Sequence, residues 1–215
     1  MKGGLAFALG AVTALALAGV AHGVGSPNRG RPVAALYVDR RRGPYEGMPG
    51  VHAYGEAEDA TAYKGPHAVV AHPPCGHWGN YSARAHDDGH TGPIAVDQVR
   101  QYGGVLEHPR RSKLWRAKGL PKPGEPPDAW GGYTIEVSQH WWGHLAEKRT
   151  WLYIVGVDPD QIPPLPPEIP PPASRMEGRV SRGVIERMAK SKRHLTPPAF
   201  AAWLVELARR STRSR

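Results

Sequence analysis

The sequence reads AVVAHPPCG from Ala68 to Gly76. Its first four residues are apolar, and Pro73 and Pro74 end this run before it is long enough for a helix. The pattern predicts a short buried strand, Ala68–Ala71, that leads into a stiff turn carrying Cys75. Because parallel sheets place their reactive groups at the carboxyl ends of strands, this stretch predicts an α/β domain with Cys75 at its working edge.

The segments on either side of this strand fit the same fold. Short apolar runs alternate with polar, turn-rich loops, which favours a Rossmann-like sheet of parallel strands with helices between them. A helix over residues 94–102 places Ala95, Val99 and Tyr102 on one face and ends at Gly103. Further strands are expected over residues 33–38 and 150–155, and another begins at 105–106 and ends at 107–109.

Composition divides the chain into four parts. Residues 1–30 are an apolar leader, 31–157 form the α/β domain, 158–175 are a proline-rich linker, and 176–215 are a basic C-terminal helical segment. Seven of the eleven residues from Ile162 to Pro172 are proline. Such a stretch is typical of an extended polyproline-type spacer.

The leader has two interpretations. Lys2 precedes an uncharged run from Leu5 to Ala21, which is the pattern of a signal peptide and is barely long enough for a membrane anchor. Alternatively, these residues are an upstream extension, and the protein starts at a valine such as Val24 or Val33. We favour the extension and expect a cytoplasmic protein, with export as the alternative if residues 1–22 are a signal peptide.

The charge balance favours an anionic partner. The 215 residues carry a net charge of +9, and the segment from Ala173 onward holds eleven lysines and arginines against three glutamates. Basic side chains that face phosphates release counterions and gain affinity whatever the base sequence. DNA is therefore the expected partner, with Lys190, Lys192 and Arg193 among its contacts, although ordinary solubility explains the charge equally well.

A helix is expected within the basic segment. Thr196 is a candidate N-cap, and Pro197 suits the first turn. Four apolar residues follow at the helical period: Phe200, Trp203, Leu204 and Leu207. We expect this helix to pack back on the domain, with a basic face that either contacts DNA or is simply solvated.

Cys75 is a candidate nucleophile. It is the single cysteine of the chain, so no internal disulfide forms and a reducing compartment fits. A lone cysteine is more often a small buried hydrophobic residue. A position after a strand and two prolines favours the catalytic interpretation, because a rigid approach holds the thiol in one direction.

Three motifs resemble those of DNA cytosine-C5 methyltransferases. Pro73-Pro74-Cys75 is similar to their Pro-Pro-Cys nucleophile motif, and Val105-Leu106-Glu107-His108-Pro109 is similar to their strand ending in Glu-Asn-Val or Glu-Asn-Pro. Trp142-Gly143 through Arg149 to Tyr153-Ile154-Val155-Gly156 resembles a later Gln-x-Arg-x-Arg motif and the strand after it. The order agrees over residues 33–156, which indicates a small, degenerate relative with a methyltransferase sheet. The short length, the basic tail and the reduced set of motifs are compatible with a phage-type protein.

The resemblance implies a mechanism. Cys75 would attack C6 of cytosine, Glu107 in its protonated form would act at N3, and Arg149 would hold the base carbonyl or a phosphate. S-adenosylmethionine would supply the methyl group. The target base is flipped out of the duplex in this family, and four further residues are candidate substrate or DNA contacts: Pro74, His77, Trp142 and His144.

The cofactor loop departs from the family. The glycine-rich Phe-x-Gly-x-Gly motif is absent, and its place after the first strand is taken by candidate cofactor residues Asp39, Gly43, Pro44 and Tyr45. The arginines at 40–42 within this loop suit a phosphate at least as well as a sulfonium cofactor. The chain also has no stretch long enough for a full target-recognition domain.

Two other functions stay open. The first is a catalytically inactive DNA-binding or accessory protein of the same fold. The second is a metal-dependent hydrolase, with zinc or another divalent ion held by a subset of His72, Cys75, His77, His86, Asp87, Asp88 and His90. Because the spacing of these residues is irregular, solvated loop histidines are the expected explanation, and we assign no metal ligand.

Overall fold

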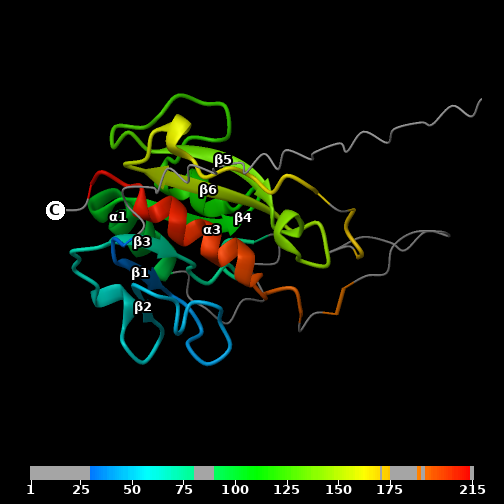
Figure 1. Cartoon of the computed structure of the whole chain (residues 1–215). Helices are drawn as coiled ribbons and strands as arrows, with labels where there is room; N and C mark the ends of the chain where they lie inside the picture. The colour runs from blue at the N-terminus through cyan, green and yellow to red at the C-terminus, as the bar shows by residue number, and fades with distance from the viewer. Residues whose placement is uncertain (1–29, 80–89, 170, 175–187, 190–191, 214–215) are drawn as a thin grey trace, which may run out of the picture.

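A six-stranded mixed sheet organises the protein (Figure 1). The computed structural model describes residues 30–79, 90–169, 171–174, 188–189 and 192–213. In spatial order the strands are β2 (Val51–Tyr54), β1 (Val33–Leu36), β3 (Ala68–Ala71), β4 (Gly104–Pro109), β6 (Arg149–Val155) and β5 (Tyr133–Ser138). The described α-helices are α1 (Thr91–Tyr102), α2 (Lys113–Lys118) and α3 (Pro198–Arg209), with short 3-10 helices η1 (Ala60–Ala62), η3 (Gln139–Trp142) and η4 (Pro159–Gln161).

The order of the strands reverses beside β1. This strand pairs in parallel with β2 on one side and with β3 on the other, and β4 continues in parallel with β3. Strand β6 runs antiparallel to both β4 and β5, so β5 points the same way as β1 to β4. The carboxyl ends of five strands therefore share one edge with the amino end of β6. In open α/β sheets, ligands bind at this edge where the strand order reverses.

The antiparallel strand corrects the prediction of a parallel sheet. Residues 139–148, which join β5 to β6, include only the single turn of η3. A parallel neighbour needs a crossover of about a dozen residues or more, usually a helix, to return the chain to the same edge. The α/β class is confirmed, and the sheet is mixed.

Alternate residues of the strands supply two cores. Val33 and Ala35 of β1 belong to the core under α3, whereas Ala34 and Leu36 belong to the core under α1. The two-residue period of a strand sends successive side chains to opposite faces of a sheet. Because both faces of the sheet are covered, β3, β4 and β6 are buried almost throughout.

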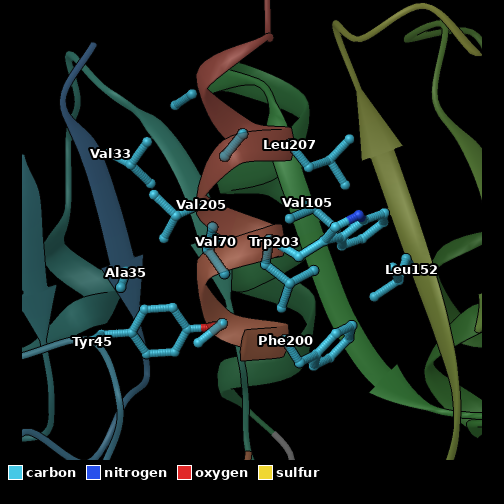
Figure 2. Close-up of a cluster of buried hydrophobic side chains, with 14 of the residues drawn as sticks. Val33, Ala35, Tyr45, Val70, Val105, Leu152, Phe200, Trp203, Val205 and Leu207 are labelled. Carbon is cyan, nitrogen blue, oxygen red and sulfur yellow. The ribbon is translucent and has the colours of Figure 1, made fainter. Parts of the chain in front are cut away.

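Helix α3 covers one face of the sheet (Figure 2). Phe200 is fully buried, and its ring centroid lies 4.9 Å from that of Trp142 and 6.2 Å from that of Trp203. The indole N–H of Trp203 donates to the carbonyls of Pro163 and Pro164, which fastens the start of the proline-rich segment to the helix. The expected packing of this helix on the domain is thus observed.

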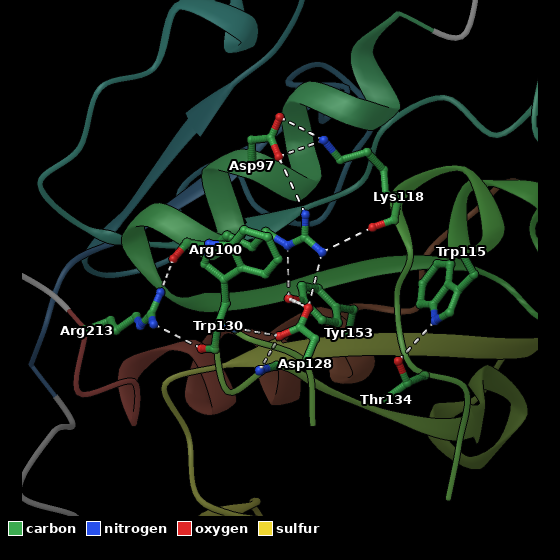
Figure 3. A network of polar contacts seen from close by, with 10 residues as sticks. Asp97, Arg100, Trp115, Lys118, Asp128, Trp130, Thr134, Tyr153 and Arg213 are labelled. Carbon is green, nitrogen blue, oxygen red and sulfur yellow. Dashed lines mark hydrogen bonds and ion pairs between the residues drawn. The ribbon is translucent and has the colours of Figure 1, made fainter. Parts of the chain in front are cut away.

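A polar network fixes the loop between α2 and β5 (Figure 3). The Asp128 carboxylate accepts hydrogen bonds from the Tyr153 hydroxyl at 2.7 Å and from the Arg100 guanidinium at 3.2 Å. Arg100 is itself buried and stacks on the Trp130 ring, 3.7 Å from its centroid. No chemistry was assigned to this loop from the sequence, and its role in the fold is to anchor the chain before it enters β5.

Most predicted elements are present with shifted bounds. The strand at 68–71 is confirmed in full, whereas the strand predicted at 33–38 ends at Leu36 and the helix predicted at 94–102 begins at Thr91. The strand predicted to begin at 105–106 and end at 107–109 spans 104–109, and the strand predicted at 150–155 spans 149–155. The elements β2, α2 and β5 were not predicted. Thr196 does not cap α3, because Pro197 occupies the N-cap and no side chain bonds the first turn.

Parts of the predicted outer segments lie outside the described residues. These include 1–29 of the leader and most of the basic stretch before Met188. Among the residues that are described, no helix is long and apolar enough to cross a membrane.

The packing of α3 predicts a large effect for Phe200→Ala. Removing a fully buried ring leaves a cavity between two tryptophans, so the free energy of unfolding should fall by about 3–5 kcal/mol. Urea denaturation measures this change. The exposed apolar residue Leu165 is the control, since Leu165→Ala should stay within about 0.5 kcal/mol of the wild type. Equal effects of the two substitutions would contradict this packing.

Candidate functional site

A cleft of about 850 Å³ opens at the carboxyl edge of the sheet. Its walls come from the ends of β1, β3 and β4, from the start of β6, and from the segment that leads into α3. The lining residues fall in the ranges 37–39, 42–45, 72–76, 78–79, 107–112, 147–149 and 193–196. The cleft thus lies at the reversal of strand order, where the fold concentrates loops from separate strands.

Cys75 lies at the cleft on an exposed turn after β3. The backbone N–H of His72 donates to the Leu36 carbonyl at 3.0 Å, which ties the base of the turn to β1. Pro73 and Pro74 then restrict the backbone up to the thiol, and the Cys75 carbonyl accepts from the Trp78 N–H at 3.2 Å. An exposed thiol on a restrained turn suits a nucleophile better than a packing role.

Glu107 is buried on the α3 face of β4, where it contacts two other segments. His72 Nδ1 lies 2.9 Å from Oε2, and Gln139 Nε2 donates to Oε1 at 3.0 Å. Burial alone would raise the pKa of this carboxyl, but the hydrogen bond from His72 and the charges of His72, Lys148 and His108 lower the pKa to about 2. These contacts favour the carboxylate form of Glu107, whereas the resemblance implies a protonated acid.

Tyr45 extends this contact into a chain of three side chains. Its hydroxyl oxygen lies 2.6 Å from His72 Nε2, so the imidazole bridges Tyr45 and Glu107. The phenol is 2% exposed, and burial together with the charge of Glu107 raises its pKa well above the usual value. Tyr45, predicted to bind the cofactor, lines the cleft, while its ring packs in the core and its hydroxyl contacts His72.

Lys148 is a functional candidate that was not predicted from the sequence. It lines the cleft, and its ammonium donates to the Leu195 carbonyl at 3.3 Å. The pKa of Lys148 is lowered overall, because the effect of burial is larger than the opposing effect of the negative charges of Glu107 and of a Cys75 thiolate. The lysine therefore lies close enough to Cys75 to stabilise the thiolate electrostatically. The sequence did contain one indication of this position. Lys148 and Leu152 are four residues apart in an extended segment, so their side chains point to the same face of the sheet, the face covered by α3.

Arg149 lines the cleft but turns toward the other face of the sheet. It alternates with Trp151, which belongs to the core under α1. Its guanidinium forms an ion pair with Glu136, which also accepts hydrogen bonds from Arg110 and from the Trp151 indole at 3.0 Å each. Arg149 is thus separated from Glu107 by the sheet and held at the rim.

The loop after β1 contributes a charged turn. Asp39, Gly43 and Pro44 line the cleft as predicted positions for a cofactor. One oxygen of the Asp39 carboxylate accepts from the backbone N–H groups of Arg41 and Arg42 at 2.9 and 3.1 Å, and the Asp39 carbonyl accepts from Gly43 at 2.6 Å. A Cβ at position 43 would lie 2.3 Å from the Asp39 carbonyl oxygen, so this turn requires glycine.

The other predicted substrate contacts are scattered. Pro74 and Arg193 line the cleft, whereas His77 and Lys192 are exposed outside it. Trp142 and His144 are buried away from the cleft, Trp142 against α3 and His144 with its Nδ1 on the backbone of Ala146. Their predicted contact with substrate does not match these positions, because packing against the fold already uses their surfaces. Lys190 is outside the described residues.

His72 and Gln139 both contact Glu107, although the sequence did not predict a role for either residue beside it. His72 was considered only as a metal ligand, and Gln139 was assigned no role. Gln139 is fully buried and also donates to the Thr150 hydroxyl at 3.1 Å. Neither contact follows a local motif, because both depend on the pairing of strands distant in the sequence.

A metal centre is not supported by the described part of the chain. His86, Asp87 and Asp88 of the alternative ligand set lie outside it. The described residues contain no cluster of three or more histidine, cysteine, aspartate or glutamate side chains with metal-binding geometry.

The fold and the cleft define an α/β protein with an exposed cysteine, a buried carboxylate and a lysine at the carboxyl edge of a mixed sheet. Comparison of the chain with protein-family models, with curated proteins and with solved structures finds no match in any of the three. The chemistry of the cleft is therefore the basis for assigning a function.

The position of Lys148 predicts that Cys75 loses reactivity in Lys148→Met. Removing the ammonium should slow alkylation of the thiol by iodoacetamide at pH 7 about three- to tenfold, since tenfold corresponds to one pKa unit. Lys148→Arg keeps the charge and should retain most of the rate. Lys122 pairs with Glu125 on an exposed loop, so Lys122→Met serves as the control. An unchanged rate in Lys148→Met would remove this lysine from the site.

Proposed function

We propose that this protein is a DNA cytosine-C5 methyltransferase-like enzyme that uses Cys75 as its nucleophile. The observation that carries the proposal is that Cys75 and Glu107, taken from two separate motifs, line the same cleft. The resemblance requires a thiol and an acid on either side of one pyrimidine ring. Their placement at a single sheet edge supports that pairing, since nothing in their sequence separation alone brings them together.

The chemistry of cytosine explains why these groups are needed. C5 of the ring is a poor nucleophile, and addition of the Cys75 thiolate at C6 converts the ring into an enamine that accepts a methyl group at C5. Electron density that moves onto N3 during the addition must be neutralised, which is the task of Glu107. Lys148 favours the thiolate form of Cys75 before the addition.

S-adenosylmethionine is the proposed cofactor, and it would supply the methyl group. The loop after β1 fits such a ligand, because Asp39 and Arg42 present charges of both signs at the cleft. A carboxylate suits a sulfonium or a ribose hydroxyl, and a guanidinium suits the carboxylate of the amino-acid part. Arg42 makes this loop equally suited to a phosphate.

Binding of DNA is supported by the charge at the cleft. Six basic residues line it, Arg42, Arg110, Arg111, Lys148, Arg149 and Arg193, against three acidic ones, Asp39, Glu107 and Glu147. Two of the arginines, Arg110 and Arg149, share the Glu136 carboxylate. The remaining positive charge fits a phosphate backbone passing across the opening.

An accessory DNA-binding protein is the second candidate. The observation in its favour is the cofactor loop, where Asp39, Gly43 and the backbone between them satisfy one another and Tyr45 is buried. In that function the basic cleft would bind DNA without methyl transfer. The trapping experiment below separates the two candidates.

The proposed chemistry predicts a covalent adduct. The full-length protein, incubated with S-adenosylmethionine and duplex DNA containing 5-fluorocytosine, should form a complex that survives denaturing electrophoresis. The fluorine cannot leave as a proton does, so the enzyme stays attached to C6. Cys75→Ser should abolish the adduct, and DNA with ordinary cytosine is the control. If the wild-type protein forms no adduct, the methyltransferase function is wrong and the accessory function gains support.

The charge of the cleft predicts salt-dependent DNA binding. Arg42 and Arg111 are exposed and line the cleft, so Arg42→Ala and Arg111→Ala should each reduce the slope of log K against log salt by about one. Fluorescence anisotropy with a nonspecific duplex measures the slope. Arg116 is exposed on α2 outside the cleft, and Arg116→Ala should leave the slope unchanged. Wild-type binding that does not respond to salt would contradict a phosphate-led contact.

A further inference from the structure

The buried chain from Tyr45 through His72 to Glu107 is not accounted for by the three motifs. The Tyr45 hydroxyl lies 2.6 Å from His72 Nε2, and His72 Nδ1 lies 2.9 Å from Glu107 Oε2. The side chains of His72 and Glu107 are only 12% and 10% exposed. Continuous hydrogen bonding through three buried titratable groups is the arrangement in which a proton can be stored and passed on.

Glu107 needs such a source of protons. The His72 hydrogen bond at 2.9 Å and the surrounding positive charges favour its carboxylate form, because together they outweigh the effect of burial and lower its pKa. A carboxylate accepts hydrogen bonds but has no proton to give to N3 of cytosine. The proton that the reaction requires must therefore reach Glu107 from a neighbouring group during the addition.

His72 is the neighbour with the right chemistry. His72 and Gln139 both hydrogen-bond the Glu107 carboxylate, and the amide of Gln139 does not release a proton at neutral pH. Lys148 influences Glu107 through its charge, but its ammonium donates to the Leu195 carbonyl. His72 is also three residues from Cys75 on the proline-stiffened turn, so the nucleophile and the imidazole move as one unit.

We propose that His72 is a positioning and proton-supplying residue that acts through Glu107, with Tyr45 orienting its ring; the proposal rests on the methyltransferase function argued above. In the addition step, Cys75 Sγ bonds to C6, the C5–C6 π pair moves through C4 onto N3, and N3 takes a proton from Glu107. Glu107 receives the proton of the His72 Nδ1–H, and the imidazolium becomes a neutral imidazole. One thiolate and one imidazolium are consumed, and the adduct and the imidazole are uncharged.

The groups around His72 support this direction of proton flow. Glu107 on β4 is the acidic partner, Tyr45 after β1 offers its hydroxyl to the other nitrogen, and Lys148 and His108 add positive charge near the carboxylate. The positive charges help Glu107 release the proton to the base once it has received it.

The test compares three variants in the 5-fluorocytosine trapping reaction as a function of pH. His72→Asn keeps an amide N–H near the position of Nδ1 but has no acidic proton. It should slow adduct formation about 100-fold or more at every pH tested. Tyr45→Phe keeps the imidazole but removes its hydroxyl partner, and it should lower the rate less. His67, which stacks on His52 outside the cleft, supplies the control His67→Asn.

Two further measurements distinguish loss of the proton role of His72 from damage to the structure and from failure of the proposed methyltransferase function. Alkylation of Cys75 should be unchanged in His72→Asn, which shows that the turn is intact. Proton NMR of the protein without DNA should show a downfield imidazole N–H signal that is lost in His72→Asn and in Glu107→Gln but kept in Cys75→Ser.

The outcomes are distinct. If the wild-type protein forms an adduct and His72→Asn forms it at a rate within twofold, the proton role of His72 is wrong while the methyltransferase function stands. If the NMR signal is absent from the wild-type protein, His72 does not donate a hydrogen bond to Glu107, and the proposed proton transfer between them is wrong. If no protein forms an adduct, the proposed function fails and takes this role with it.

Discussion

The carboxylate of Glu107 is buried, so it cannot form its hydrogen bonds with bulk water. Side chains at this edge of the sheet provide hydrogen bonds in place of water. A buried charge costs several kcal/mol unless partners satisfy it. His72 follows β3 and Gln139 follows β5, and both bond this carboxylate. Lys148, just before β6, adds a positive charge nearby. One charge thus connects segments at β3, β4, β5 and β6, and three of these residues, His72, Glu107 and Lys148, also line the cleft.

The alternation of side chains along β6 sorts two neighbouring cations into different roles. Lys148 shares the face of Leu152 and contributes to the environment of Cys75, whereas Arg149 shares the face of Trp151 and pairs with Glu136. A shift of one residue in the pairing of β6 would exchange them. The cross-strand partnership of Glu107 with Leu152 therefore determines which cation approaches the thiol.

Local sequence patterns were sufficient to predict part of this structure. The strand at 68–71 was predicted in full because an apolar run ends at two prolines, and the end of α1 was predicted because Gly103 follows it. Strand β5 was missed although Tyr133, Ile135 and Val137 alternate with polar residues. Cys75 and Glu107 stood out as motifs, whereas the contacts of His72 and Gln139 depend on strand pairing that no local pattern specifies.

The position of α3 has a consequence for how the protein matures on the ribosome. The helix is made after every strand, yet it completes one core with Phe200, and the residues just before it line the cleft. Domains fold as units during translation. A nascent chain that ends before residue 193 would display an uncovered sheet face and an open-sided cleft. The α3 core and the wall of the cleft are therefore complete only after residues 193–209 have been made.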